Sequence, residues 1–228
     1  MTGHLLVGKW KLETENWKSL VNGPLEDKNN SYIHLMFWLS GGHMMALSDL
    51  RKFAKVELWK TQDLLSSKEF NKLGPEPLDK NFTFRKFGEV LKNKKARLRS
   101  DRASARRGRI KQVLMNPEII AGIGNIYSSE ALWRAKIYPE KDVSKLSEKD
   151  LKNLFTAIKK VLTMGIKLGG ESFSDYRKPD GSKGDFDTER KAYKREGQKC
   201  FCCKTKIKRI KFGGRSAFFC PRCQKLDK

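Results

Sequence analysis

Short apolar runs that end at turn residues dominate roughly the first sixty residues of the chain and predict β-strands. The runs cover residues 5–7, 32–39, 43–47 and 54–59. Gly41 and Gly42 form a turn between the second and third runs, whereas the polar stretch at residues 13–30 is expected to be a loop or insertion. The front of the chain is therefore predicted to be a meander of antiparallel sheet.

In the second half of the chain, apolar positions recur every three or four residues, which is typical of helices. The clearest helix is expected at residues 148–168. Ser147 and Asp150 form a variant of the capping box at its start, and Gly169 with Gly170 ends it. Its apolar side chains are expected to be core residues.

Two polar segments border these helices. Residues 84–91 form a short helical segment that leads into a basic stretch at residues 94–109. This stretch is expected to be a mobile linker unless a phosphate backbone orders it. Residues 171–190 are rich in Gly, Ser, Asp and Arg and are expected to form a long loop.

Residues 110–132 combine a short helix, a Gly-x-Gly-Asn turn and a second helix. Asn125 is the predicted N-cap of the second helix. Gly122 and Gly124 would let the backbone approach a phosphate, which the amides of the helix N-terminus would face. The alternative is an ordinary helix-turn-helix corner. A dinucleotide fingerprint is excluded because Tyr127 stands where its third glycine should be.

Four of the five cysteines form two C-x2-C pairs separated by sixteen residues, which is the spacing of a four-thiolate zinc site. They are Cys200, Cys203, Cys220 and Cys223. Four thiolates fill a tetrahedral shell, so one structural zinc ion is favoured over a catalytic metal or a disulfide framework. Cys202 is the spare cysteine.

The residues between these pairs read as two basic strands around a turn at Gly213 and Gly214, with Arg215 just after it. Across the chain, 49 Lys and Arg face 26 acidic residues, giving a net charge of +23. This excess favours a nucleic-acid partner over a small-molecule substrate, with a merely solvated basic surface as the alternative. No leader and no membrane span is apparent, which predicts a cytoplasmic, nucleoid-associated protein with no membrane partner.

The order of these parts resembles the formamidopyrimidine-DNA glycosylase and endonuclease VIII family, and the formamidopyrimidine branch fits better. The similar stretches are residues 1–3, 49–53, 73–78, 122–130 and 193–224. The resemblance implies an α+β fold with a truncated N-terminal β-sandwich, a helix-two-turn-helix module and a C-terminal zinc-finger hairpin. The implied domains are residues 1–78, residues 79–195 with a lesion-covering loop at about 171–190, and residues 196–228.

The resemblance also implies roles for individual residues. Lys111, Asn125 and Arg215 match positions that grip phosphates around an extruded nucleotide. Lys52 stands at a DNA-binding position where many relatives have arginine, so it keeps the charge without the bidentate geometry.

Three residues match the wedge that fills the gap left by the flipped base. They are Met1, Arg51 and Phe53. Arg51 would also bind DNA by facing the orphaned partner base, and Phe53 would insert into the stack. The alternative for Met1 and Phe53 is an ordinary core or turn residue.

Catalytic residues are where the chain departs from the family. The family opens with Met-Pro-Glu, whose proline amine attacks the sugar and whose glutamate transfers protons, and it carries a further lysine in the early sheet. This sequence matches none of the three, so no catalytic residue is assigned.

The expected function is base-excision repair of double-stranded DNA that contains damaged bases or abasic sites. The family resemblance implies a monomeric enzyme that removes oxidised purines (formamidopyrimidine, 8-oxoguanine) and nicks abasic sites. Both activities are expected to be impaired in this chain. The alternative is a noncatalytic, zinc-dependent binder of damaged or branched DNA. A zinc-ribbon RNA-binding protein would need neither the wedge nor the Gly-x-Gly-Asn turn.

Overall fold

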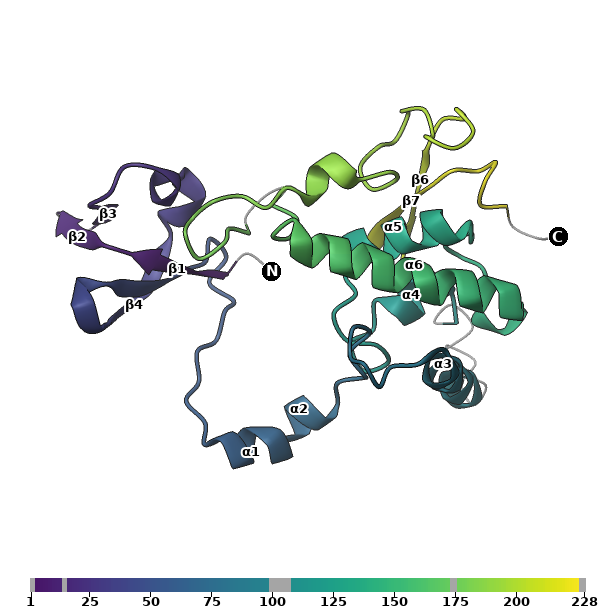
Figure 1. Ribbon diagram of the computed structural model, residues 1–228, viewed down its shortest axis with the longest axis horizontal. Coiled ribbons are helices and arrows are strands. Elements are labelled where there is room, and N and C mark those ends of the chain that lie inside the picture. Colours follow the sequence, from purple (N-terminus) through teal and green to yellow (C-terminus); the bar gives the residue numbers. More distant parts are fainter. Residues whose placement is uncertain (1–2, 14–15, 99–107, 173–175, 226–228) are drawn as a thin grey trace. The chain divides into compact units, whose positions relative to one another are not determined.

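The computed structural model describes residues 3–13, 16–98, 108–172 and 176–225 (Figure 1). The chain divides into two compact units. The first contains residues 1–58 and 165–189, and the second contains residues 59–164 and 190–228. Among the described residues, no helix combines the length and the apolar character that crossing a membrane requires.

A three-stranded antiparallel sheet with the order β1-β5-β4 forms the centre of the first unit. Its strands are β1 (His4–Gly8), β4 (Ile33–Trp38) and β5 (Met44–Ser48). Leu6 and Ala46 are buried on one face, where Trp10, Trp17 and Leu25 complete a small core. The alternation of buried and exposed residues along β1 is the period of two expected for a strand with one covered face.

Three sequence predictions for this unit are wrong. β5 pairs with both β1 and β4, so the sheet is not a sequential meander. Residues 54–59 form no strand, and most of their side chains are exposed. The expected loop at residues 13–30 contains part of a hairpin of β2 (Trp10–Glu13) and β3 (Asn16–Ser19), followed by the short helices η1 (Pro24–Glu26) and η2 (Lys28–Asn30).

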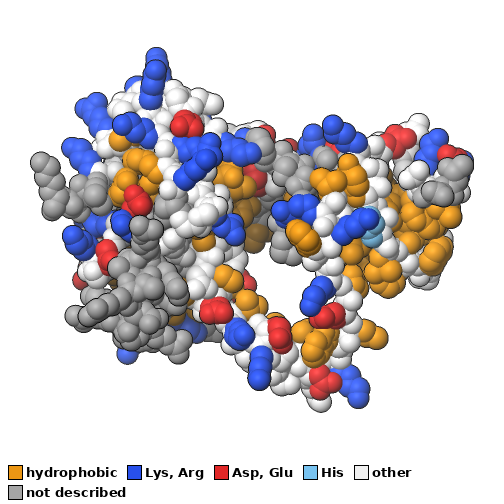
Figure 2. Space-filling model, turned by 180° about the vertical axis from the view of Figure 1, so that it is seen from behind, with side chains coloured by type: hydrophobic (Ala, Val, Ile, Leu, Met, Phe, Trp, Pro, Cys, Tyr) orange, Lys and Arg blue, Asp and Glu red, His pale blue; other side chains and the backbone are white. Residues whose placement is uncertain are grey.

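The opposite face of the same sheet is also apolar. The register aligns two rows of side chains across the three strands. These rows are Leu5, Leu47 and Leu35, then Val7, Met45 and Phe37. None of them is buried, and Figure 2 shows hydrophobic side chains gathered over this unit, on the right of that view. Among the described residues, this second face is therefore apolar and at least partly exposed to solvent.

The loop that follows the long helix packs against this sheet. The Val7 backbone N–H donates a hydrogen bond of 2.7 Å to the Pro179 carbonyl oxygen. The buried Arg177 guanidinium donates to the Asp27 carboxylate at 3.1 Å. Between residues 176 and 190 the described backbone holds the short helix η6 (Phe186–Glu189) and one isolated β-bridge from Asp185 to Glu171, and otherwise agrees with the expected loop.

The second unit is mainly helical. Its helices begin with α1 (Thr61–Ser66), α2 (Lys68–Asn71) and α3 (Phe84–Leu98). They continue with α4 (Ile110–Leu114), α5 (Asn125–Ala135), the short η5 (Val143–Lys145) and α6 (Glu148–Lys167). The predicted basic linker at residues 94–109 is wrong for residues 94–98, because α3 continues to Leu98. Residues 99–107 lie outside the described part of the chain.

Local sequence explains the two ends of α6. The Asp150 N–H donates to Ser147 Oγ and the Ser147 N–H donates to the Asp150 carboxylate, both at 3.1 Å, which confirms the capping box. At the other end, Gly169 and Gly170 have φ values of 69° and 86°. The Gly170 N–H donates to the Gly165 carbonyl oxygen at 2.8 Å, so the helix ends in a Schellman motif.

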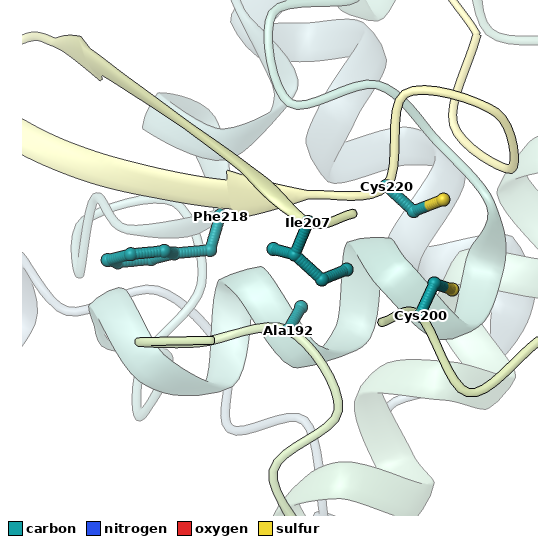
Figure 3. Packing of buried hydrophobic residues seen from close by; sticks show 5 residues of the cluster. All are labelled: Ala192, Cys200, Ile207, Phe218 and Cys220. Atoms are coloured by element: carbon teal, nitrogen blue, oxygen red, sulfur yellow. The ribbon is translucent and has the colours of Figure 1, made fainter. Parts of the chain in front are cut away.

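The C-terminal part of the second unit is a hairpin of β6 (Lys208–Phe212) and β7 (Arg215–Phe219). Figure 3 shows the core beneath it, with Phe218 at one end and Cys200 and Cys220 at the other. Trp133 of α5 and Tyr193 pack against this core. The hairpin is therefore held on the helices by a small apolar cluster that includes two of the cysteines.

Candidate nucleic-acid interface

The first turn of α5 forms one wall of the candidate site. Gly124 has extended backbone angles and occupies the N-cap position, so the prediction that Asn125 is the N-cap is wrong. Asn125 is instead the first helical residue. Its side-chain oxygen is buried and accepts no hydrogen bond within the described part of the chain. The first amide groups of a helix also have no acceptor inside it, so this turn presents polar groups that require an external partner.

Lys111 of α4 supports this turn from behind. Its side chain is fully buried, and its Nζ donates to the Asn125 backbone oxygen at 3.0 Å, to Ser128 Oγ at 3.0 Å and to Ser129 Oγ at 2.6 Å. Burial, followed by the positive charge of Arg215, lowers the pKa of Lys111 to about 7, and the charge of Glu130 opposes this shift. Lys111 therefore lies beside the site without being exposed to a ligand in this conformation.

The hairpin turn forms the opposite wall. Gly213 has a left-handed φ of 57°, and a Cβ atom there would lie 2.2 Å from the side-chain amide of Gln112 in α4, so glycine is favoured at this position. The backbone of Gly213 therefore packs closely against the Gln112 side chain, and this packing holds the hairpin turn against α4. Arg215, the first residue after the turn, is exposed. The geometry therefore brings Arg215 of the zinc finger to the same site as Asn125 of α5.

A hollow of about 540 Å³ lies between these two walls. Cationic side chains line it with two aromatic rings. The lining consists of Asn125, Tyr193, Lys194, Arg209, Gly214, Arg215, Ser216, Phe218 and one acidic residue, Glu196. Arg209 is fixed by a 3.0 Å hydrogen bond from its Nε to Ser216 Oγ. A site that combines arginines, helix amides and a side-chain amide suits an oxyanion such as phosphate.

Glu130 and Gln224 join the zinc finger to the helices. The Glu130 carboxylate is fully buried and accepts hydrogen bonds from the backbone N–H groups of Lys191, Ala192 and Tyr193 at 2.9–3.1 Å. It also pairs with Arg134 at 2.8 Å. The Gln224 side chain accepts from the Cys220 N–H and donates to the Ile137 carbonyl oxygen, each at 2.8 Å.

Sequence reasoning assigned no role to either residue. A glutamate on the polar face of a helix looks like a solvated charge, and only its buried partners distant in sequence reveal the anchoring role. The same holds for Gln224.

The four zinc-site thiols converge. All four Sγ atoms lie within 4.8 Å of one another, which fits the tetrahedral thiolate shell of one zinc ion. The indole N–H of Trp133 donates to Cys200 Sγ at 3.4 Å, an outer contact that orients this ligand. Hydrogen bonds from Thr205 lower the pKa of Cys203 to about 6, whereas burial raises the pKa of the Cys220 and Cys223 thiols, so the convergence of the four sulfurs is what supports a zinc site. The fifth thiol, Cys202, is exposed.

The predicted wedge residues lie in the first unit, in a tight turn after β5. The buried Asp49 carboxylate accepts hydrogen bonds from the backbone N–H groups of Arg51, Phe53 and Ala54 at 2.8–3.2 Å. Lys52 adopts a left-handed φ of 55° within this turn. The Phe53 ring is 77% exposed, and the Arg51 guanidinium lies over it at 5.8 Å. Asp49 thus organises the loop, a role that the sequence pattern did not reveal. The third predicted wedge residue, Met1, lies outside the described residues.

Comparison with known proteins identifies the class. A family profile for the formamidopyrimidine-DNA glycosylase H2TH domain matches residues 73–177, and a profile for the zinc finger found in FPG and IleRS matches residues 197–226. The formamidopyrimidine-DNA glycosylase of Novosphingobium aromaticivorans is 37% identical over 226 residues, which cover 99% of this chain and 74% of that relative. The chain belongs to the formamidopyrimidine-DNA glycosylase family. The relative from Zymomonas mobilis is 37% identical over 96% of this chain and 72% of its own length.

Solved formamidopyrimidine-DNA glycosylase structures share the fold. A complex of the Lactococcus lactis enzyme with DNA containing an abasic site matches with a TM-score of 0.76 at 31% identity, covering 99% of this chain and 73% of that chain. A complex of the same enzyme with DNA containing FAPY-dG matches with a TM-score of 0.75 at 31% identity, over 99% and 72% of the two chains. The predicted fold class and the four-cysteine zinc finger are thereby confirmed.

Proposed function

We propose that this chain binds double-stranded DNA containing damaged bases or abasic sites. In this proposal, Asn125 and Arg215 contact a backbone phosphate in the hollow between α5 and the hairpin turn. The observation that carries it is the convergence of an exposed arginine and a helix N-terminus whose first side chain has a buried, unbonded oxygen. Two related complexes that contain damaged or abasic DNA support the same ligand class.

Lys111 acts indirectly in this proposal. Its ammonium group is fully engaged by α5, so it fixes the helix turn that binds the phosphate instead of reaching the phosphate itself. Replacement by alanine would therefore leave the Asn125 carbonyl and two serine hydroxyl groups without their shared donor.

The wedge role is proposed for Arg51 and Phe53, with Lys52 as a further DNA contact. An exposed aromatic side chain in a turn held by three backbone hydrogen bonds is suited to insertion between base pairs, because the turn is already ordered before DNA binds.

The biological function that we propose is base-excision repair of oxidised purines, the activity implied by family membership. The second candidate is a noncatalytic binder of damaged DNA, which would need the zinc finger and the cationic hollow but no attacking amine.

Replacing Arg215 by alanine tests the phosphate contact. Loss of one phosphate contact should weaken binding and reduce the slope of log K against log [salt] by roughly 0.9, with little change in base preference. The measurement is fluorescence anisotropy of an abasic-analogue duplex at several KCl concentrations. Lys160→Ala, an exposed cation on α6, is the control for a lost charge. A slope that is the same in Arg215→Ala and the wild type would remove Arg215 from the interface.

The pH dependence of binding tests the position of Lys111. A phosphate beside Arg215 should raise the pKa of Lys111 from about 7, so binding takes up a proton. The affinity is therefore expected to fall by up to about tenfold as the pH rises from 7 to 9, because the free protein must then gain a proton on binding. Lys111→Met should flatten this profile. Identical profiles for the two proteins, both folded and zinc-loaded, would contradict the coupling.

A further inference from the structure

A second cationic hollow lies at the other end of α5. It has a volume of about 380 Å³. Five basic side chains line it. They are Lys136, Lys141, Lys145, Arg222 and Lys225. Asp150 is the only acidic residue in the lining, so the formal charge around the hollow is +4. Ile137 and Cys223 are its only apolar members, so the hollow does not suit an apolar ligand.

The walls of this hollow are held in place by contacts that involve neither solvent nor ligand. The buried Lys141 pairs with Asp150 at 3.1 Å, and Asp150 is itself fixed by the capping box of α6. Lys136 ends α5 in a left-handed conformation with a φ of 57°. Arg222 belongs to the second cysteine pair, which the Gln224 side chain ties to Ile137. Three separate segments therefore present their cations to one preformed space.

Four of these cations have no acidic partner in the part of the chain that the structure describes. They are Lys136, Lys145, Arg222 and Lys225. The four side chains are exposed around an open hollow, so solvent screens their mutual repulsion, and an anion that binds among them would neutralise several of these charges at once. Asp150 does not neutralise them, because Lys141 and Ser147 already engage its carboxylate. The arrangement suits a multivalent oxyanion, which can accept hydrogen bonds from several cations at once.

We infer that this hollow is a second phosphate-binding site, separate from the hollow beside Asn125 and Arg215. The two hollows lie at opposite ends of α5, which has 11 residues. With a rise of 1.5 Å per residue, the helix ends are separated by about 16 Å. DNA advances 3.4 Å per nucleotide along its axis, so this separation corresponds to roughly five nucleotides of one strand. The site takes phosphate groups either from the backbone of the bound DNA or from free phosphate compounds.

The test uses the full zinc-loaded chain with the double variant Lys136→Ala/Lys145→Ala. The matched control is Lys86→Ala/Lys160→Ala, which removes two exposed cations that do not line the hollow. Zinc content and circular dichroism of both variants establish that the fold is intact. The first arm measures the salt slope of binding to a 20-base-pair abasic-analogue duplex, and the second measures binding of inorganic pyrophosphate by calorimetry.

A DNA phosphate in the hollow gives a salt slope lower by roughly 0.9 in the double variant than in the control. A free phosphate compound as the ligand gives an unchanged DNA slope, with pyrophosphate binding weakened about tenfold or more. Equal DNA slopes and equal pyrophosphate affinities in the two variants would overturn the inference. The Arg215→Ala variant tests the first hollow separately. If the Lys136→Ala/Lys145→Ala experiment contradicts the second site, the proposed DNA-binding function still stands. If the Arg215→Ala experiment contradicts the first hollow, the second site still stands.

Discussion

Replacing Cys200 by serine is expected to unfold the zinc finger and to weaken DNA binding by at least about a hundredfold. Structural zinc sites contribute roughly 10–16 kcal/mol of apparent binding free energy to folding, and the small hairpin core cannot replace this contribution. Two of the five buried residues in that core are themselves zinc ligands. Loss of the metal therefore removes both the crosslink and much of the apolar packing that holds the hairpin.

The loss should extend beyond the finger itself. Arg215 lines the proposed phosphate site because the hairpin turn packs on α4, and the Glu130 and Gln224 anchors hold segments on either side of the metal site. Zinc content by mass spectrometry and anisotropy with an abasic-analogue duplex measure the two effects. Cys202→Ser is the matched control, because that thiol is exposed and lies outside the converging group of four. Full zinc content and wild-type affinity in Cys200→Ser would contradict this assignment.

The second large effect concerns catalysis. The 228-residue polypeptide is expected to form the Schiff-base intermediate at least about a hundredfold more slowly than a full-length relative. The attacking amine must have a free lone pair, and family resemblance assigns this role to an N-terminal proline followed by glutamate. Pro75 and Glu76 repeat that pair of residues in the sequence, but the Pro75 nitrogen lies inside a peptide bond and cannot form a Schiff base.

Borohydride trapping on DNA with an abasic site measures this step. The relative from Novosphingobium aromaticivorans, with 37% identity, serves as the active comparison, and equal DNA occupancy of the two proteins is established first. The expected result is bound DNA with almost no covalent product. Trapping at a rate similar to that of the relative would show that another amine attacks the sugar, and the amine of Met1 would be the first to examine by peptide mapping.

Local sequence was sufficient where the physical cause is local. The cysteine spacing predicted the converging thiols, the Gly213-Gly214 pair predicted the hairpin turn, and Ser147 with Asp150 predicted the start of α6. Each of these features depends on residues close together in the chain or on a metal shell with fixed geometry.

The failures have nonlocal causes. The apolar run at residues 54–59 has the composition of a strand, but it belongs to no strand of the sheets that the described residues form. The position of β5 between β1 and β4 depends on the pairing of β1 with β5, whose partners lie 36–44 residues apart in the chain, and strand patterns alone do not determine such pairing. The burial of Lys111 was likewise not predicted, because the acceptors that α5 supplies to its ammonium group come from residues 14–18 positions further along the chain.

The wedge and phosphate roles came from family resemblance. The composition of the chain showed only an excess of positive charge, which predicted a nucleic-acid partner but no role for any single residue. The wedge and phosphate roles stay predictions, and the structure shows only that Asp49 orders the loop that carries Phe53 and that Asn125 lines the hollow.

Amide hydrogen exchange with and without DNA tests the central claim most directly. The zinc-loaded chain is compared alone and bound to a duplex with a stable abasic-site analogue, under conditions where the protein is saturated. Because the phosphate is expected to lie between the first turn of α5 and the hairpin turn, peptides that cover residues 122–128 and 212–217 should exchange more slowly in the complex. Saturated binding that leaves the exchange of both segments unchanged would contradict the account and would place the DNA on another surface.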